Sequence, residues 1–436
     1  MAKPKLCLIP AAQGSKLYSV LPSSGVGDFD FTRDTIATRI NSQGLIETVA
    51  SGVSRLNYQM IDGVVKGCPH HILEPLRTNL IPYSEDFSQW FKNNSPTITT
   101  NIAIAPDGTI SADGIQSLTV GYKSVSQTIV ITPNSTVTAS FFVKKETSET
   151  FFGGFSIVFQ NGTTKVLYVI VDAVNGTGTI AQSSLTGNIK VEDYGNYWRI
   201  SATTTDNGGN TNCRLSYEST LSKNGTTLSD GAGSVRTLWG AQLEVGSYPT
   251  SYIPNYGTAA GVTRSAETAT GSGDAATFNS EQGVLMVETS FVDDISFKGI
   301  SISSGANGNC IRIYTSVNTD NSLVFRVTVN SVDQVLKLYT LNDASLYNKI
   351  SIKYKENDFN VFINGFKLLT DNIGSTFSSG VLNQLNFNRS DGLDPFYGST
   401  KQIQYFDTAL TDSELEQLTS WVSFTDMANG QLYTIE

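Results

Sequence analysis

The chain has 436 residues, of which 39% are hydrophobic and 16% charged, so it is long enough for two or three folded domains and too apolar for a disordered polypeptide. Its formal net charge of −10 argues against nucleic acid as a partner, because binding phosphates requires a basic face. The longest apolar runs are only as long as strands, which argues against a secretory signal and against membrane insertion.

Residues 1–84 show weak periodicity and little hydrophobic mass. A segment of this kind does not offset its own ordering entropy. We therefore expect an extended N-terminal arm that becomes ordered by lying along the following domain, sister chains or a larger assembly.

Residues 85–256 change to short apolar runs separated by Pro-Asn, Asn-Gly and Gly-Gly, which favour turns between strands. The regular spacing predicts an antiparallel β-sandwich of jelly-roll type. The unit ends on LWGAQLEVGSYPTSYIP, residues 238–254, whose apolar residues alternate imperfectly. We expect Trp239 and Tyr252 to cap the core where the chain leaves this sandwich.

Residues 257–276 are small, polar and Gly-rich, which is typical of a linker. Strand-like runs resume over residues 277–436 and predict a second sandwich. Asn364-Gly365 lies between two apolar runs and predicts a type I′ hairpin, because both residues accept a positive φ.

The C-terminal part predicts one short helix. Thr411 and Glu414 have the spacing of a capping box, and Leu415 and Leu418 form one apolar side. The predicted fold class is therefore all-β, with an N-terminal extended arm, two antiparallel β-sandwiches and a short C-terminal helix.

Three separated pieces within roughly residues 29–264 resemble a recurrent arrangement in bacteriophage virion proteins, in which an arm precedes a carbohydrate-binding-module-like sandwich. They are FTRDTIATRINSQGLIETVASGVSRLNY, RTNLIPYSEDFSQW and LWGAQLEVGSYPTSYIP. Two later pieces resemble the laminin-G and concanavalin-A-like lectin superfamily, namely FNVFINGFKL and GSTKQIQYFDTALTDSELEQL.

These resemblances imply a non-enzymatic fibre or decoration protein of a phage particle, made in the bacterial host cytoplasm and carried on the virion surface. Residues 1–84 would attach it to other virion proteins, and the two sandwiches would bind cell-surface glycans. The resemblance also implies a homo-oligomer, with a trimer favoured over a dimer or a larger ring because fibres commonly use three-fold symmetry.

The sequence offers little catalytic chemistry. His70 and His71 lie beside Cys68, but adjacent side chains of an extended segment point to opposite sides, so a structural connector is the preferred interpretation. The run ENDFNV from Glu356 lacks the last acid of the strand found in some concanavalin-like hydrolases. The alternatives to a glycan-binding role are a glycan-degrading depolymerase and a purely structural decoration protein without glycan binding.

Sugar binding requires an exposed aromatic ring and polar side chains that pair with hydroxyl groups. Candidates in the second sandwich are Tyr314, Asn388, Asp391, Phe396 and Tyr397. Candidates in the first sandwich are Tyr83, Trp90 and Tyr197. Because aromatic residues in sandwiches mostly fill the interior, packing is the competing interpretation for each of them.

No cofactor is expected, apart from a Ca²⁺ ion of the kind that lectin-like domains often hold through loop carboxylates. The candidate ligands are Asp293, Asp294, Asp391 and Asp394. Their spacing fits no defined calcium loop, so ordinary solvated turn acids are the simpler interpretation. The four cysteines are widely scattered and are expected to be reduced thiols.

Overall fold

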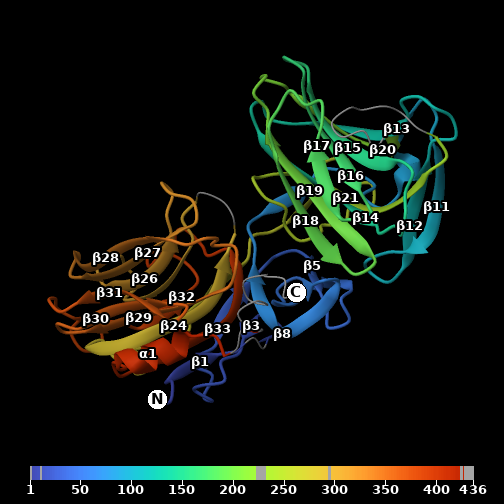
Figure 1. The fold of residues 1–436 in the computed structure, drawn as a ribbon. Coiled ribbons are helices and arrows are strands. Elements are labelled where there is room, and N and C mark those ends of the chain that lie inside the picture. Colours follow the sequence, from blue (N-terminus) through green and yellow to red (C-terminus); the bar gives the residue numbers. More distant parts are fainter. Residues whose placement is uncertain (1, 10–11, 222–231, 293–295, 423–425, 427–436) are drawn as a thin grey trace.

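The computed structural model describes residues 2–9, 12–221, 232–292, 296–422 and 426. It confirms the all-β class: antiparallel sheets form two β-sandwiches, and the described residues contain a single α-helix, α1 (Asp412–Thr419). Figure 1 shows the two sandwiches side by side, with the N-terminal residues between and beneath them.

The first sandwich consists of two six-stranded sheets. One sheet has the order β10 (Phe91–Asn93), β13 (Ser124–Val130), β20 (Asn212–Leu221), β15 (Phe152–Gln160), β16 (Lys165–Asp172) and β17 (Thr177–Ile180). The other has the order β11 (Thr97–Ile104), β12 (Ile110–Gln116), β21 (Val235–Val245), β14 (Thr136–Lys144), β19 (Tyr197–Thr205) and β18 (Asn188–Tyr194). Alternate residues of each strand, such as Phe141 and Val143 of β14, meet in the core between the sheets.

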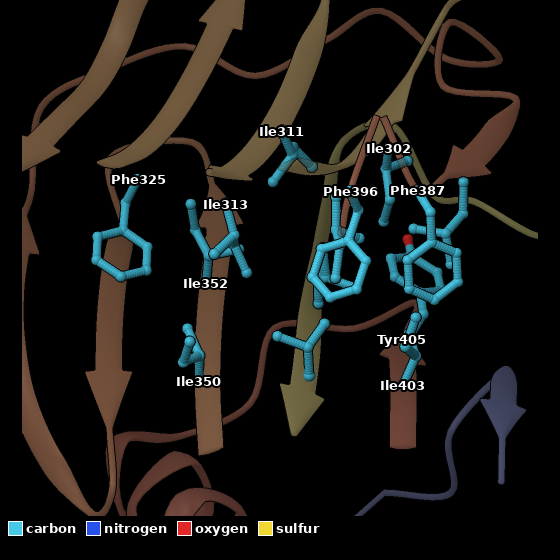
Figure 2. Packing of buried hydrophobic residues seen from close by; sticks show 14 of the residues in the cluster. Ile302, Ile311, Ile313, Phe325, Ile350, Ile352, Phe387, Phe396, Ile403 and Tyr405 are labelled. Atoms are coloured by element: carbon cyan, nitrogen blue, oxygen red, sulfur yellow. The ribbon is translucent and has the colours of Figure 1, made fainter. Parts of the chain in front are cut away.

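The second sandwich pairs an eight-stranded sheet with a five-stranded one. The larger sheet has the order β31 (Phe366–Asp371), β30 (Phe359–Ile363), β29 (Asn348–Lys355), β24 (Gln282–Phe291), β33 (Gly398–Phe406), β8 (Val64–Leu73) and β7 (Arg55–Ile61), and β1 (Leu6–Leu8) also pairs with β33. The smaller sheet has the order β28 (Val332–Thr340), β27 (Ser322–Val329), β26 (Cys310–Thr315), β25 (Gly299–Ser303) and β32 (Gln384–Asn386). Figure 2 shows the core between them, where Ile311 and Ile313 of the smaller sheet face Ile350 and Ile352 of the larger one.

The N-terminal residues differ from the expected extended arm of residues 1–84, because they are built into the second sandwich. β1, β7 and β8 belong to its larger sheet, and Leu6, Leu8, Phe29 and Phe31 are part of its core. These four core residues are almost completely buried, whereas other apolar residues of the region, such as Ile9 and Val20, are exposed. A low overall hydrophobicity therefore concealed a contribution to a core whose other residues lie hundreds of positions away.

Three small sheets include strands of the N-terminal region, and the first two of them join it to residues 257–276, which were expected to form a linker. They are β2 (Ala12–Gln13), β3 (Lys16–Leu17), β4 (Phe29–Thr32) and β23 (Thr268–Thr270); β9 (Arg77–Asn79) and β22 (Val262–Arg264); and β5 (Ala37–Ile40) with β6 (Ile46–Val49). The linker composition thus reflects short strands with tight turns between them.

A β-bulge explains the imperfect alternation of LWGAQLEVG. The pairing of β21 with β14 shifts between Ser140 and Phe142, and Gly240 lies there at φ +61°. The extra residue moves Trp239 to the outer face of the sheet, where its ring centroid lies 4.6 Å from that of Tyr252. Trp239 and Tyr252 therefore pack on the outside of the sandwich, with Ile46 of the N-terminal region, and do not cap its core.

Two local predictions are confirmed. Asn364 and Gly365 have φ values of 50° and 84° between β30 and β31, as a type I′ hairpin requires. Thr411 and Glu414 form the capping box of α1, and Leu415 is fully buried against the second sandwich.

Five buried charged side chains lie where the two sandwiches and the N-terminal region meet. We call them the buried ion cluster: Arg33, Arg55, Glu74, Arg264 and Glu267, each at most 5% exposed. Glu267 accepts hydrogen bonds from Arg33 (Nη1–Oε1, 2.7 Å), from Arg55 (Nε–Oε1, 2.8 Å) and from the backbone N–H of Glu74 (2.9 Å). Glu74 in turn accepts from Arg55 at 2.8 Å and forms an ion pair with Arg264 at 2.8 Å.

The cluster also holds the segment that leaves the first sandwich. The Ser251 backbone N–H and hydroxyl donate to the Glu74 carboxylate at 2.8 and 2.6 Å, and Arg55 donates to the Ser251 hydroxyl at 2.7 Å. Burial alone would raise the pKa of Glu74, but Arg264 and Arg55 hold it well below its usual range. The arginines thus favour the ionised carboxylate, which ties three segments together.

Replacing Glu267 by Gln should destabilise the protein by about 3–5 kcal/mol, because Arg33 loses its carboxylate partner while it remains buried. Glu47→Gln, which breaks the partly exposed pair of Arg39 and Glu47, should cost less than about 1 kcal/mol. Urea denaturation of both variants measures the difference. Equal losses would mean that the cluster is no more important than a surface ion pair.

Candidate functional site

The smaller sheet of the second sandwich has an outer face that carries charged and aromatic side chains. Ile311 and Ile313 of β26 point into the core (Figure 2). Side chains alternate between the two faces of a strand, so Arg312 and Tyr314 point outward from the same strand.

The neighbouring strand places a second arginine beside the first. Arg312 of β26 and Arg326 of β27 are Cα partners in the antiparallel register, and Ser301 and Leu336 continue the same row on the flanking strands. Like charges directly opposite each other destabilise a sheet. Arg326 donates to Asp333 at 2.7 Å, which offsets one of the two charges.

A loop after β32 adds a third arginine with two carboxylates. Arg389 donates to both oxygens of Asp391, at 2.8 and 2.9 Å, and to Asp394 at 2.7 Å. The hydrogen bonds from Arg389 hold the pKa of Asp391 well below its usual range. Asn307 donates to the same carboxylate at 2.7 Å and so joins the loop to the sheet.

These side chains surround a pocket of about 110 Å³. Its walls include Phe297, Arg312, Tyr314, Arg326, Asn388 and Arg389. The rings of Phe297 and Tyr314 lie 6.1 Å apart at 52°, and Phe297 is 41% exposed. The pocket therefore offers an accessible aromatic surface beside charged groups.

Two polar atoms at this pocket have no hydrogen-bond partner among the residues that the structure describes. Arg312 is 6% exposed, and its Nε is unpaired, while its Nη1 makes only a long contact of 3.3 Å to Asn307 Oδ1. Asn388 is 9% exposed, and its Oδ1 is unpaired. Because buried polar groups are normally satisfied, a free donor and a free acceptor at one pocket indicate a place for a polar ligand.

The structure brings together some of the sequence-predicted site residues and separates others. Tyr314, Asn388 and Asp394 line the pocket, and Asp391 supports its wall through Arg389. Phe396 is 1% exposed and packs against Phe291 and Phe387 in the core, as Figure 2 shows for Phe387, so it offers no ring to a ligand. Phe396 lies in a polar, turn-rich stretch of the sequence, so its inward orientation could not be predicted from the neighbouring residues.

Tyr397 lies away from the pocket. It is partly buried, and Arg77, Glu267 and Arg264 are the charged groups that act on its hydroxyl, with burial as the main reason for its raised pKa. Its backbone oxygen accepts from Val292 at 3.2 Å. Tyr397 therefore belongs to the region of the buried ion cluster.

The four candidate Ca²⁺ ligands do not form a metal site among the described residues. Asp293 and Asp294 lie outside the described residues. Asp391 and Asp394 are both engaged by Arg389, which occupies the oxygens that a Ca²⁺ ion would need. Among the described residues, no group of three or more His, Cys, Asp or Glu side chains could hold a metal ion.

The aromatic candidates of the first sandwich are mostly packing residues. Trp90 is 2% exposed and contacts Phe87 and Phe141, and Tyr197 is 1% exposed. Tyr83, at 36% exposure, lies at the surface. Trp90 and Tyr197 therefore pack inside the protein and offer no exposed ring to a sugar.

Sequence reasoning missed Arg312, Arg326, Arg389 and Phe297. The runs CIRIYT and LVFRVTV each carry an arginine in the middle of an apolar strand, at a position where period-two alternation turns it outward. Two such arginines on adjacent strands are a signal of a charged outer face. Whether the two arginines lie directly opposite each other depends on the strand register, which cannot be read from the sequence.

A larger groove runs between the two sandwiches. Two adjoining hollows of about 480 and 850 Å³ share the residues Ile72, Glu74, Lys190, Pro249, Ser290, Ser345 and Ser399. The groove is open, and it follows the line along which the sandwiches meet. Its lining also carries charged and aromatic side chains, among them Glu192, Arg199 and Tyr194.

No family model matches the chain, and no curated protein matches it. Solved structures with similar regions include a carbohydrate-binding module of a Ruminococcus gnavus sialidase bound to α2,3 sialyllactose, at 19% identity and a TM-score of 0.29, covering 35% of this chain and 94% of that one. Domain 4 of a Geobacillus stearothermophilus arabinanase, in complex with arabinotriose, matches at 11% identity and 0.29, covering 36% and 73%. The binding domain of botulinum neurotoxin serotype G matches at 13% and 0.26, covering 61% and 50%.

The histidine segment, considered above as a Cys-His pair or a metal site, is structural. His70 and His71 are 5% and 1% exposed, and their rings lie on opposite sides of β8, against Tyr347 and against Phe31 respectively. Cys68 is exposed, and all four cysteines are free. Both nitrogens of His71 lack a partner, and burial lowers its pKa to about 3, with a smaller effect of Arg55.

The depressed pKa of His71 sets an acid sensitivity. Below the unfolded-state pKa of about 6.5 the unfolded chain binds a proton that the folded protein refuses, so stability falls as the pH drops towards 3. His71→Phe keeps an aromatic ring beside Phe31 and Phe387 and removes the titrating imidazole.

We expect the free energy of unfolding of His71→Phe to fall less steeply between pH 6.5 and 3, by up to about 1.4 kcal/mol per pH unit. Urea denaturation across this range measures the slope, and values above pH 7, where the imidazole is neutral in both states, provide the internal control. Identical slopes for the two proteins would contradict the assignment.

No described helix is long and apolar enough to cross a membrane.

Proposed function

We propose that the protein is a non-enzymatic glycan-binding protein and that the pocket on the outer face of the smaller sheet binds the sugar. The observation that carries the proposal is the combination of an accessible aromatic surface at Phe297 and Tyr314 with unpaired polar atoms of Arg312 and Asn388. A pyranose ring presents an apolar face and a rim of hydroxyl groups, and this arrangement complements both.

The same pocket supports binding without hydrolysis. Glycoside hydrolysis uses two carboxyl groups that flank the scissile bond. Among the described residues of the pocket wall, Asp394 is the single carboxylate, and it is paired with Arg389 at 2.7 Å. A depolymerase would need a second acid at this site.

Tyr314→Ala should weaken glycan binding, because it removes the ring that would stack on the sugar. Stacking of this kind contributes roughly 1 kcal/mol or more, so the affinity should fall by about five- to tenfold or more. A glycan array followed by calorimetry on the best ligand measures this effect in the full chain.

Tyr339→Ala is the matched control for Tyr314→Ala, because this tyrosine lies on the edge strand β28 and outside the pocket wall. Unchanged binding by Tyr314→Ala would place the sugar elsewhere, with the groove between the sandwiches as the next site to test. Absence of any glycan ligand would favour a purely structural role.

We further propose that the protein is a fibre or decoration component of a bacteriophage particle, assembled as a homo-oligomer for which a trimer is favoured. The support is the resemblance of the three sequence pieces within residues 29–264 to virion proteins. Arg33 of the first piece belongs to the buried ion cluster, and Ser251 of the third piece donates to Glu74 of that cluster, so these two pieces act together in the fold. Attachment through residues 1–84 would have to use the part of their surface that the second sandwich leaves exposed.

Immunogold electron microscopy of phage particles tests the location. Labelling of particles at the head or the tail is the expected result, and a mass measurement on the purified protein should give three copies. Unlabelled particles would remove the virion role and leave the glycan-binding proposal to its own test.

A further inference from the structure

We propose that this pocket selects sugars that carry a carboxylate, with Arg312 as the residue that binds the acid group. The inference rests on the proposed glycan-binding function and adds the class of sugar. It follows from how the charges at the pocket are balanced.

Two of the three arginines at the pocket already have carboxylate partners. Arg326 is paired with Asp333, and Arg389 is paired with both Asp391 and Asp394. Arg312 has no carboxylate within 4 Å in the described part of the chain. Within the described residues, Arg312 is therefore the one arginine of the three without a carboxylate of its own, and it shares the more distant Asp333 with Arg326.

Arg312 is held in a place that costs stability. It is 6% exposed and directly opposite Arg326, and its Nε has no partner. A buried charge without a partner is unfavourable, and like charges across a strand pair add to the cost. The Tyr314 ring, 5.2 Å from the guanidinium carbon, offsets only part of this. A ligand carboxylate would complete the site.

The geometry favours a carboxylate over a neutral group. A guanidinium is planar and presents two parallel N–H donors, which match the two oxygens of a carboxylate. Tyr314 lies next to Arg312 on the same outer face, and the unpaired Asn388 Oδ1 can accept from a sugar hydroxyl. The sugar ring, its carboxylate and one of its hydroxyl groups would thus contact Tyr314, Arg312 and Asn388 respectively.

The size and overall charge restrict the ligand further. A volume of about 110 Å³ is well below the roughly 300–1,000 Å³ of pockets that enclose drug-sized ligands. The chain as a whole carries a net charge of −10, which repels a long polyanion. The pocket therefore suits a single acidic sugar at the end of a glycan.

The test compares methyl glucuronide and methyl N-acetylneuraminide with the neutral methyl glucoside and with methyl glucuronide methyl ester, by calorimetry on the full chain. The acidic sugars should bind at least tenfold more tightly than the neutral ones. Arg312→Gln should lose that advantage and keep the weak binding of the neutral sugars. Arg39→Gln, which removes one positive charge at a surface ion pair outside this pocket, should bind like the unmodified protein.

A melting temperature of Arg312→Gln equal to or above that of the unmodified protein is also expected, because the substitution relieves the opposition to Arg326. If Arg312→Gln does not fold, Arg312→Lys keeps the charge and loses the paired donors, and it should bind the acidic sugars several-fold more weakly.

Three other results would each overturn a stated part of the proposal. Equal binding of acidic and neutral sugars, unaffected by Arg312→Gln but lost in Tyr314→Ala, would overturn the carboxylate selectivity and leave the glycan-binding function intact. Equal binding of inorganic phosphate or sulfate would show a general anion site. Binding of none of the sugars would overturn both proposals.

Discussion

The buried ion cluster is the constraint on which the architecture depends. Its carboxylates, Glu74 and Glu267, are almost fully removed from water, and each is bound by arginines from segments far apart in the chain. Charges in such a place are tolerated only when every partner is present. The cluster therefore fixes the N-terminal region, the exit of the first sandwich and the entry to the second in one arrangement.

Sequence patterns that depend on neighbouring residues were reliable. The strand class, the type I′ hairpin at Asn364-Gly365 and the capping box at Thr411 follow from local chemistry and are present. Long-range organisation was not readable in the same way. Leu6 and Phe31 lie in short apolar runs, and their burial depends on a core whose other residues come mostly from beyond residue 268.

At the candidate site, too, local residue types could be read from the sequence, whereas orientation and strand register could not. Tyr314 and Asn388 could be selected because their residue types suit a sugar, whereas the choice between Phe396 and Phe297 depended on which ring points outward. The pairing of Arg312 with Arg326 is a matter of register between two strands, and a shift of either strand by one residue would have sent its arginine into the core. Composition and spacing carry no information of that kind.

The pairing of β1 with β33 has a consequence for how the chain is made. Leu6 finds its partner in Tyr405, so β1 cannot dock until a strand hundreds of residues later in the chain has been made. The first sandwich contains only residues from Ile81 to Leu243 in its core and can form meanwhile. The second sandwich must pair strands hundreds of residues apart, and pairing over such separations is intrinsically slow.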